Sequence, residues 1–248
     1  MRNPRIYQNQ PMQPSDIISL DDDAFGHVVR VLRLKDGDAI TLFNGQLLDG
    51  QLGDFNAELV NVGKKKAQAK IIDFIAKDNE SPLNIHLGQG ISRGDRMDFA
   101  LQKSVELGVN TITPLFTERC GVKLTGERLA KKKDQWQKIV ISACEQSGRC
   151  TVPEVKDPIS LDEWAQQETN ALKLNLHPKA EHSIMSLPEK NERVRLLIGP
   201  EGGLCDEEIE SVNNQGFTPV LLGPRVLRTE TAALAAITAL QCRYGDLT

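Results

Sequence analysis

The chain has 248 residues, of which 40% are hydrophobic, enough to bury the core of one large domain or of two smaller ones. The formal net charge of −4 neither indicates nor excludes a nucleic-acid binder, because such binding follows local patches rather than the sum. No window approaches the roughly 18 apolar residues of a membrane span, and the first residues lack the apolar region of a signal peptide. Five cysteines without C-x-x-C spacing are typical of reduced thiols, so we expect a cytoplasmic protein without a membrane association.

The first 72 residues are predicted to be rich in β-strands. Residues 38–43 form a strand candidate, and the Asn44-Gly45 dipeptide that follows is typical of a hairpin turn. Several short strands at this spacing predict a small barrel or sandwich. The other strand candidates of this region are 47–52, 57–62 and 67–74, with turns at Gly53-Asp54 and Gly63-Lys64.

The chain changes character at the polar stretch 73–82, which ends in proline. We therefore expect a first domain at 1–73, a linker at 74–82 and a second domain at 83–248. In the second domain strands alternate with helices, which predicts a parallel sheet wrapped on both faces. Ser92 and Thr229 are suitable N-terminal caps for two of these helices, and Gly108 is suitable for a C-terminal cap. The expected strands are 83–89, 111–116, 172–176, 194–198 and 218–222, and the expected helices are 95–107, 128–145, 206–213 and 229–243.

Two loops of the second domain, 199–203 and 221–228, follow short apolar runs and are rich in glycine and proline. Each run predicts a buried strand, and open α/β sheets bind ligands outside the carboxyl ends of their strands. The glycine spacing of the first loop matches neither G-x-G-x-x-G nor G-x-x-x-x-G-K-[ST], so a dinucleotide or triphosphate site has weak support. Glu201 would repel phosphate, although it could accept from a ribose hydroxyl or attract a cation. An ordinary strand-to-helix turn remains the alternative.

Arg225 and Arg228 lie three residues apart in the second loop. They are either solvated charges, or one contacts phosphate and the other the reacting base, since a planar guanidinium suits both tasks. His177-Pro178 follows the strand 172–176 and could line the same pocket or be structural. The four histidines have no metal-ligand spacing, so no metal site is expected, and the absence of G-x-S-x-G leaves serine hydrolase chemistry without support.

Basic residues form clusters, most of them in the first domain. A charge run is usually a solvated face, but clusters that share one face could bind an RNA backbone through salt-sensitive phosphate contacts. The alanine-rich final helix could pack on its own sheet or form a subunit interface. The candidate RNA-binding residues are Arg2, Arg5, Arg30, Arg33, Lys35, Lys64 and Lys65.

Six motifs, in order along nearly the whole chain, resemble the RsmE family of bacterial methyltransferases, which act on N3 of a uridine in 16S ribosomal RNA. The resemblance implies an α/β fold, a SPOUT-type parallel sheet with a C-terminal trefoil knot, preceded by a small PUA-like β-barrel domain that binds RNA. It also implies S-adenosylmethionine as cofactor, 16S rRNA of the small ribosomal subunit as partner, and a homodimer, which we place at the C-terminal helix. It says least about 156–171. The motifs are RVLR from Arg30, LQKSVELGV from Leu101, ITPLFTERC from Ile112, LNLHP from Leu174, LIGPEGG from Leu197 and LGPRVLRTETA from Leu222.

For such an enzyme the methyl group is already electrophilic, so the protein mainly has to align N3 of the uracil with it. Loss of the N3 proton makes the ring anionic, and Arg228, or as second choice Arg225, would stabilise that charge. Glu201 or Glu230 could accept the proton or could only position a ligand. The cofactor-binding residues implied are Leu176, His177, Pro178, Ile198, Gly199, Pro200, Glu201, Gly203, Leu221, Leu222, Gly223, Val226, Leu227 and Thr231.

Two other classes of function stay open from the sequence. The first is a non-catalytic RNA-binding module for ribosome assembly that keeps the fold, and it would bind no S-adenosylmethionine. The second is an α/β enzyme acting on a nucleotide or a phosphorylated metabolite, against which the missing phosphate-binding motifs count.

Overall fold

The computed structural model describes residues 3–122 and 124–247, and these form two compact units. The first unit comprises the residues up to Glu80 together with Cys144–Val152, and the second comprises Ser81–Ala143 and the residues from Pro153 onward. Sequence patterns place 144–152 in the second domain. This segment joins the first unit because Glu80 accepts hydrogen bonds from the backbone N–H groups of Cys150 and Thr151. Arg2, a predicted RNA contact, lies outside the described residues.

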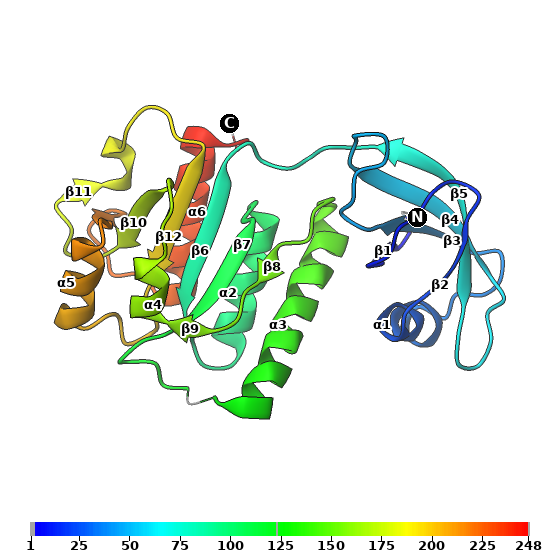
Figure 1. Ribbon diagram of the computed structural model, residues 1–248, viewed down its shortest axis with the longest axis horizontal. Coiled ribbons are helices and arrows are strands. Elements are labelled where there is room, and N and C mark those ends of the chain that lie inside the picture. Colours follow the sequence, from blue (N-terminus) through cyan, green and yellow to red (C-terminus); the bar gives the residue numbers. More distant parts are fainter. Residues whose placement is uncertain (1–2, 123, 248) are drawn as a thin grey trace. The chain divides into compact units, whose positions relative to one another are not determined.

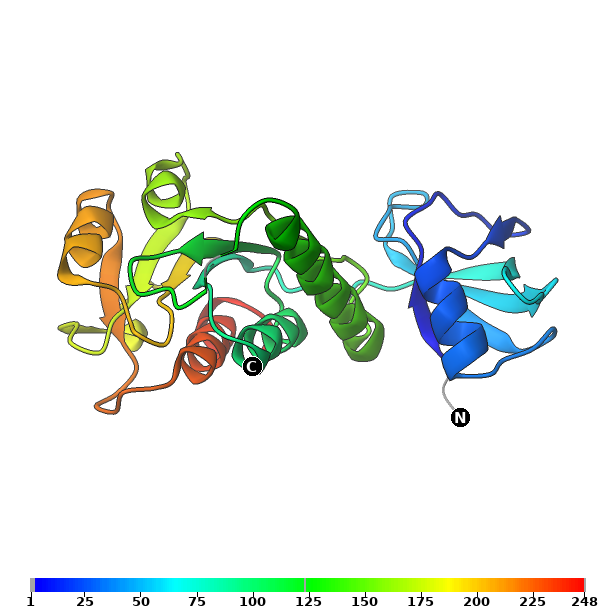
Figure 2. The same cartoon turned by 90° about the horizontal axis from the view of Figure 1, so that it is seen from below.

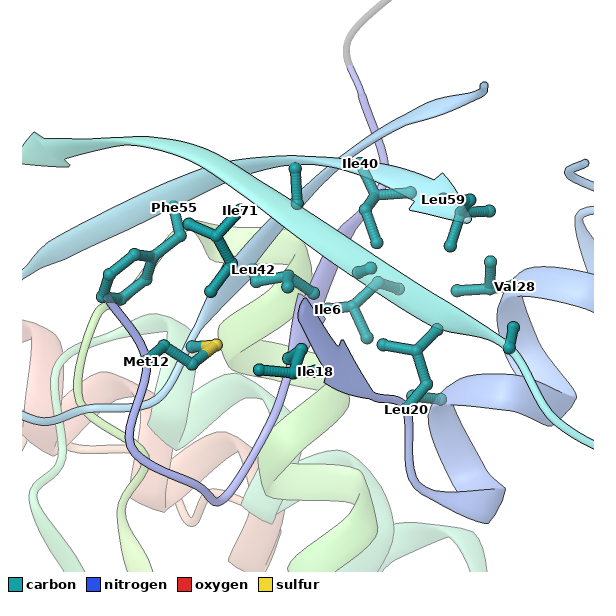
Figure 3. Close-up of a cluster of buried hydrophobic side chains, with 14 of the residues drawn as sticks. Ile6, Met12, Ile18, Leu20, Val28, Ile40, Leu42, Phe55, Leu59 and Ile71 are labelled. Atoms are coloured by element: carbon teal, nitrogen blue, oxygen red, sulfur yellow. The ribbon is translucent and has the colours of Figure 1, made fainter. Parts of the chain in front are cut away.

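The first unit is a curled five-stranded sheet around an aliphatic core. The strand order is β1-β3-β4-β5-β2, in which β1 runs parallel to β3 and the remaining pairs are antiparallel. Alternate residues of β4 are buried, as expected for a sheet with one face on a core, and Figure 3 shows Phe55 and Leu59 pointing into it. The elements are Arg5–Tyr7 (β1), Ile17–Ser19 (β2), Asp22–Phe25 (α1), Gly26–Val31 (η1, a π-helical turn), Ala39–Phe43 (β3), Gly53–Val60 (β4) and Gln68–Ala76 (β5).

Two expectations for this region are wrong. Residues 47–52 form no regular strand, and Leu48 pairs with Gln51 in an isolated bridge. Gly53-Asp54 is not a turn but the start of β4, where a Cβ on Gly53 would lie 2.2 Å from the carbonyl oxygen of Ile75. Glycine is therefore needed at Gly53 for close strand approach.

The continuous helix formed by α1 and η1 was not predicted. Its signal is the Asp21-Asp22-Asp23 run: the Asp21 side chain accepts from the backbone N–H of Ala24, and the next two carboxylates lie in the first turn. An aspartate cap followed by acidic residues is a helix start, because it satisfies and neutralises the exposed N–H groups.

The second unit is a parallel sheet with helices on both faces, as predicted. The strand order is β11-β13-β10-β12-β6-β7-β8, and β9 also pairs with β7 (Figure 1). Helix α2 packs against α6, and α4 against α5, and Figure 2 shows the two pairs on opposite faces of the sheet. The strands are Asn84–Gly90 (β6), Thr111–Phe116 (β7), Glu154–Val155 (β8), Ile159–Ser160 (β9), Leu172–Leu176 (β10), His182–Ser183 (β11), Arg193–Ile198 (β12) and Thr218–Leu221 (β13). The helices are Asp95–Glu106 (α2), Gly126–Ser147 (α3), Leu161–Gln166 (α4), Ile184–Ser186 (η2, a 3-10 turn), Asp206–Asn214 (α5) and Thr229–Tyr244 (α6).

Two predicted helix caps are wrong, because both side chains donate hydrogen bonds to carbonyl groups outside the helices. Helix α2 begins after Gly94, and the Ser92 hydroxyl donates to the carbonyl of Gly90. Thr229 is the first residue of α6, and its hydroxyl donates to the carbonyl of Gly199 over 2.6 Å. The predicted cap at Gly108 is confirmed, since this residue follows α2 with a φ of 90°.

A buried polar cluster lies near the amino ends of β6 and β12. The Trp164 indole N–H donates to Nε2 of His86, so this nitrogen carries no proton of its own. The Thr113 hydroxyl lies 2.8 Å from the same nitrogen, and the Arg195 guanidinium lies over the Trp164 ring. Burial, with the positive charges of Arg195 and Lys156, lowers the pKa of His86 to about 4.

Acidification is expected to destabilise the second unit through His86. The unfolded chain takes up a proton below its pKa of 6.5, whereas the folded chain does not, so stability present above pH 6.5 is lost as the pH falls to about 4. Each pH unit in this window costs about 1.4 kcal/mol, so the loss is at most on the order of 3 kcal/mol, and less where solvent screens the ring. Urea unfolding followed by tryptophan fluorescence at about pH 7.5 and about pH 5 measures it. His86→Gln should show a smaller drop than the wild type, and equal drops would contradict the assignment.

Candidate functional site

A cleft of about 510 Å³ lies at the carboxyl ends of β10, β12 and β13. Its walls are the segments 176–179, 198–204 and 221–230, with further residues from α2, α5 and the segment after β7. The two glycine-rich loops therefore meet at one cleft, as the sequence predicts. Of the residues predicted to bind a cofactor, Thr231 is the exception, because it lies on the exposed side of α6 and does not line the cleft.

All four candidate catalytic residues line the same cleft. Arg225 and Arg228 are exposed, and Arg228 is the residue immediately before α6, with an extended backbone. Glu230 lies in the first turn of α6, and its Oε2 atom is buried without a hydrogen-bond partner among the described residues. Glu201 lines the cleft from the loop after β12.

The topology explains why the loop 199–204 lies where it does. Strand β12 pairs with β6 so that Ile198 is opposite Gln89, and the loops after both strands are therefore neighbours. A Cβ on Gly90 would lie 2.5 Å from the backbone nitrogen of Pro200, so glycine is required at Gly90 for the loop to approach. Gln89 donates to the Thr229 hydroxyl, which itself bonds to the first carbonyl of the loop.

One carboxylate oxygen of Glu201 bonds to two residues at the start of α2 and in the segment before it. Its Oε1 accepts from the backbone N–H of Arg93 over 2.9 Å and from the guanidinium of Arg96 over 3.3 Å. Burial alone would raise the pKa of Glu201, but these hydrogen bonds and the positive charge of Arg96 outweigh burial and lower the pKa. The ionised carboxylate is therefore the favoured form in this structure.

His177 forms part of the turn after β10. Its backbone N–H donates to Val220 on β13, and its Nδ1 accepts from the backbone N–H of Lys179. Burial and the charge of Lys179 lower its pKa, so the neutral imidazole is favoured. His177 thus stabilises the turn after β10 through its hydrogen bonds, and it also lines the cleft.

Sequence reasoning missed several residues of the cleft. Arg119 lies three residues beyond Phe116, the last residue of β7, so its position near the carboxyl end of a predicted strand was a usable signal. Arg96 on α2 had no comparable signal. The cleft carries more cationic than anionic side chains, which favours ligands with phosphate or carboxylate groups. The missed lining residues are Arg96, Arg119, Lys179, Gly202, Leu204, Asp206, Ile209, Thr229 and Ala232.

The predicted RNA-binding residues of the first unit separate into two kinds. One is Arg5, for which the prediction is corrected: it is buried, pairs with Asp54 over 2.7 Å and donates to the carbonyl of Cys144. A guanidinium used in this way is a structural element of the core and is not accessible to phosphate. The other kind is exposed and consists of Arg30, Arg33, Lys35, Lys64 and Lys65.

Neither a metal centre nor a membrane span accompanies the cleft in the part of the chain that the structure describes. Among residues 3–122 and 124–247, no group of three or more histidine, cysteine, aspartate or glutamate side chains is arranged to ligate a metal ion. Within the same residues no helix combines the length and apolarity that crossing a bilayer requires.

Comparison with known proteins gives consistent matches over both units. A family model described as an RNA methyltransferase domain matches 79–241, and one described as an RNA methyltransferase PUA domain matches 20–72. The Ribosomal RNA small subunit methyltransferase E of Buchnera aphidicola (subspecies Schizaphis graminum) is 45% identical, covering 99% of this chain and 98% of its own length. The protein of that name from Bacillus subtilis is 30% identical, covering 93% and 92%.

Two solved structures are similar over the full length. One is a methyltransferase E from Neisseria gonorrhoeae bound to S-adenosyl methionine, with 42% identity, 100% coverage of both chains and a TM-score of 0.90. Another, from Legionella pneumophila and in complex with bound cofactor SAM, has 46% identity, 100% coverage of both chains and a TM-score of 0.95.

Proposed function

Because this chain belongs to the ribosomal RNA small subunit methyltransferase E family, we propose that it transfers a methyl group from S-adenosylmethionine to N3 of a uridine in 16S ribosomal RNA. The observation that carries this function is the cleft at the carboxyl ends of β10, β12 and β13. It brings together the two glycine-rich loops and the two candidate arginines, Arg225 and Arg228. A chain that only bound RNA would not need such a cleft.

The cleft fits the cofactor in size and in chemistry. Its volume of about 510 Å³ lies within the range of small-molecule sites. Leu176, Ile198 and Leu222 offer apolar surface for the adenine, and the glycines of the loop 199–204 let backbone groups reach its edge. When bound there, S-adenosylmethionine supplies an electrophilic methyl group.

The side chains at the cleft would then act on the uracil. We assign Arg228 to stabilising the negative charge on the ring as N3 loses its proton, with Arg225 as the second candidate. Of the two candidate proton acceptors, Glu230 is favoured. Its Oε2 is buried without a partner among the described residues, whereas Oε1 of Glu201 accepts two hydrogen bonds that make this carboxylate less basic. The target base has to leave its stack to reach these groups.

The first unit would bind the RNA backbone through its exposed basic residues. Changing Arg30 and Arg33 together to alanine is expected to weaken RNA binding and to flatten its salt dependence, by about 0.7–0.9 in the log–log slope for each phosphate that is no longer neutralised. Filter binding over a salt series measures both quantities. Cofactor affinity should stay unchanged, and Lys190→Ala, an exposed lysine outside the first unit, is the matched control. An unchanged slope would show that Arg30 and Arg33 are solvated surface charges that do not contact RNA phosphates.

Mass mapping of the nucleosides of 16S RNA, with and without the protein, tests the proposed function. A 3-methyluridine that depends on the protein and on S-adenosylmethionine is expected. Calorimetry separates this function from the non-catalytic assembly module, because only an enzyme needs the cofactor. Absence of binding at millimolar S-adenosylmethionine would favour the module, and turnover of a free nucleotide without RNA would favour a metabolic enzyme.

Several finer expectations belong to the same proposal. A trefoil knot is supported by the chain path: β13 pairs with β10 on the side away from β12, and α6 then returns to pack against α2. A homodimer through α6 also stays a proposal, and sedimentation of the full chain tests it. The division into a first domain at 1–73, a linker at 74–82 and a second domain at 83–248 also stays a proposal. So do the cytoplasmic location of the protein and its action on the small ribosomal subunit.

A further inference from the structure

The loop 199–204 forms one wall of the cleft and is rich in glycine. Glycine occupies three of its six positions, Gly199, Gly202 and Gly203, and Gly203 has a φ of 68°. Glycine loses more conformational freedom on ordering than other residues. A loop of this kind therefore receives a ligand well only if contacts from the rest of the protein hold it in the receptive conformation.

One set of such contacts centres on the carboxylate of Glu201. It accepts from the backbone N–H of Arg93, in the segment between β6 and α2, and from the guanidinium of Arg96, in the first turn of α2. A carboxylate near the start of a helix also interacts favourably with the helix dipole. Glu201 therefore connects the middle of the loop 199–204 to the segment that joins β6 to α2 and to the first turn of α2.

A second set comes from Arg119, after β7. Its NH1 group donates to the carbonyls of Gly202, over 3.2 Å, and of Leu204, over 3.3 Å. A Cβ on Gly202 would lie 3.0 Å from the Cβ of Arg119, so the two backbones approach closely here. Arg93 donates to the carbonyl of Gly121, which links the two sets of contacts. We call Glu201, Arg93, Arg96 and Arg119 the outer clasp.

We propose that the outer clasp positions the loop 199–204 to receive S-adenosylmethionine, and that Glu201 is a positioning residue for cofactor binding rather than the proton acceptor. This inference rests on the proposed function of the same cleft. The outer clasp affects binding because it orders a glycine-rich loop before the ligand arrives. Loss of the clasp therefore raises the free-energy cost of binding S-adenosylmethionine. Both hydrogen bonds fall on Oε1 and stabilise the ionised carboxylate, which makes Glu201 a weaker base toward the substrate.

Substitutions of Glu201 distinguish positioning from proton transfer. Glu201→Ala removes both hydrogen bonds and is expected to raise the Kd for S-adenosylmethionine about tenfold or more, as for removal of a hydrogen bond to a charged group. Glu201→Gln keeps an oxygen for the Arg93 N–H and should have an intermediate Kd. Single-turnover rates at saturating cofactor should stay within a few-fold of the wild type in both variants. An unchanged Kd with a rate reduced about 10²–10⁴-fold would identify Glu201 as the proton acceptor and overturn the proposal.

Hydrogen exchange of the ligand-free protein gives a second readout that does not depend on activity. Amides of 199–204 should exchange faster in Glu201→Ala and Arg119→Gln, while those of the sheet keep their protection. Arg128→Ala, an exposed arginine outside the clasp, is the control and should change neither exchange nor Kd. Unchanged loop exchange in both clasp variants would refute the clasp. If the wild type binds no S-adenosylmethionine, the proposed function fails, whereas the exchange experiment still decides whether the clasp orders the loop.

Discussion

Replacement of Arg228 by alanine is expected to lower the methylation rate at saturating S-adenosylmethionine by about 10²–10³-fold, the usual cost of removing one group that stabilises charge in a transition state. Arg228 is exposed at the cleft immediately before α6. Its charge matters only when N3 of the uracil becomes anionic. The loss should therefore appear in the rate of the chemical step, while the Kd of the cofactor stays close to that of the wild type.

Single-turnover assays with 16S RNA and calorimetry with S-adenosylmethionine measure the two quantities. Circular dichroism should show an unchanged fold, since Arg228 is exposed. Arg225→Ala is the matched comparison within the same loop, and a smaller loss of rate is expected from it. A near-normal rate for Arg228→Ala would remove this residue from the mechanism, and a larger loss for Arg225→Ala would exchange the two roles.

Gly90→Ala is expected to abolish most cofactor binding without any change in charge. A Cβ on Gly90 would lie 2.5 Å from the backbone nitrogen of Pro200 and 2.9 Å from the backbone carbon of Gly199. Both atoms belong to backbone, so the clash cannot be relieved by rotating a side chain. The loop 199–204 must move away from β6, and we expect the Kd to rise by about 100-fold, with a loss of about 1–3 kcal/mol in the free energy of unfolding.

Calorimetry and urea unfolding of the same variant check both values. The control is Gly26→Ala, because Gly26 is helical, with a φ of −57°, and a Cβ there meets nothing within 4 Å. This substitution should leave cofactor binding unchanged and the stability equal or slightly higher. Wild-type affinity for Gly90→Ala would show that the loop tolerates displacement, and the geometry of the cleft wall would then need revision.

The second unit was largely predictable because its signals are local. Short strand patterns predicted β7 and β10 at their observed bounds, and apolar runs that end at glycine predicted β12 and β13 within one residue. The secondary structure of the first unit was harder to predict from the sequence. Its polar and apolar residues alternate over short strands, so one glycine, Gly53, could be interpreted as a turn although it lies in β4 beside another backbone.

Chain order and strand polarity together predict that two distant loops meet at a cleft, since parallel strands direct their carboxyl ends to one edge. Side-chain partners could not be predicted in this way. Arg5 is buried against Asp54, 49 positions away, and Glu201 bonds to Arg93, 108 positions away. Such a hydrogen bond joins residues that are far apart in the sequence, so it depends on how the folded chain places their strands and loops. Local pattern specifies elements and their edges, whereas the role of each charged side chain depends on which partner the folded chain brings within about 3 Å of it.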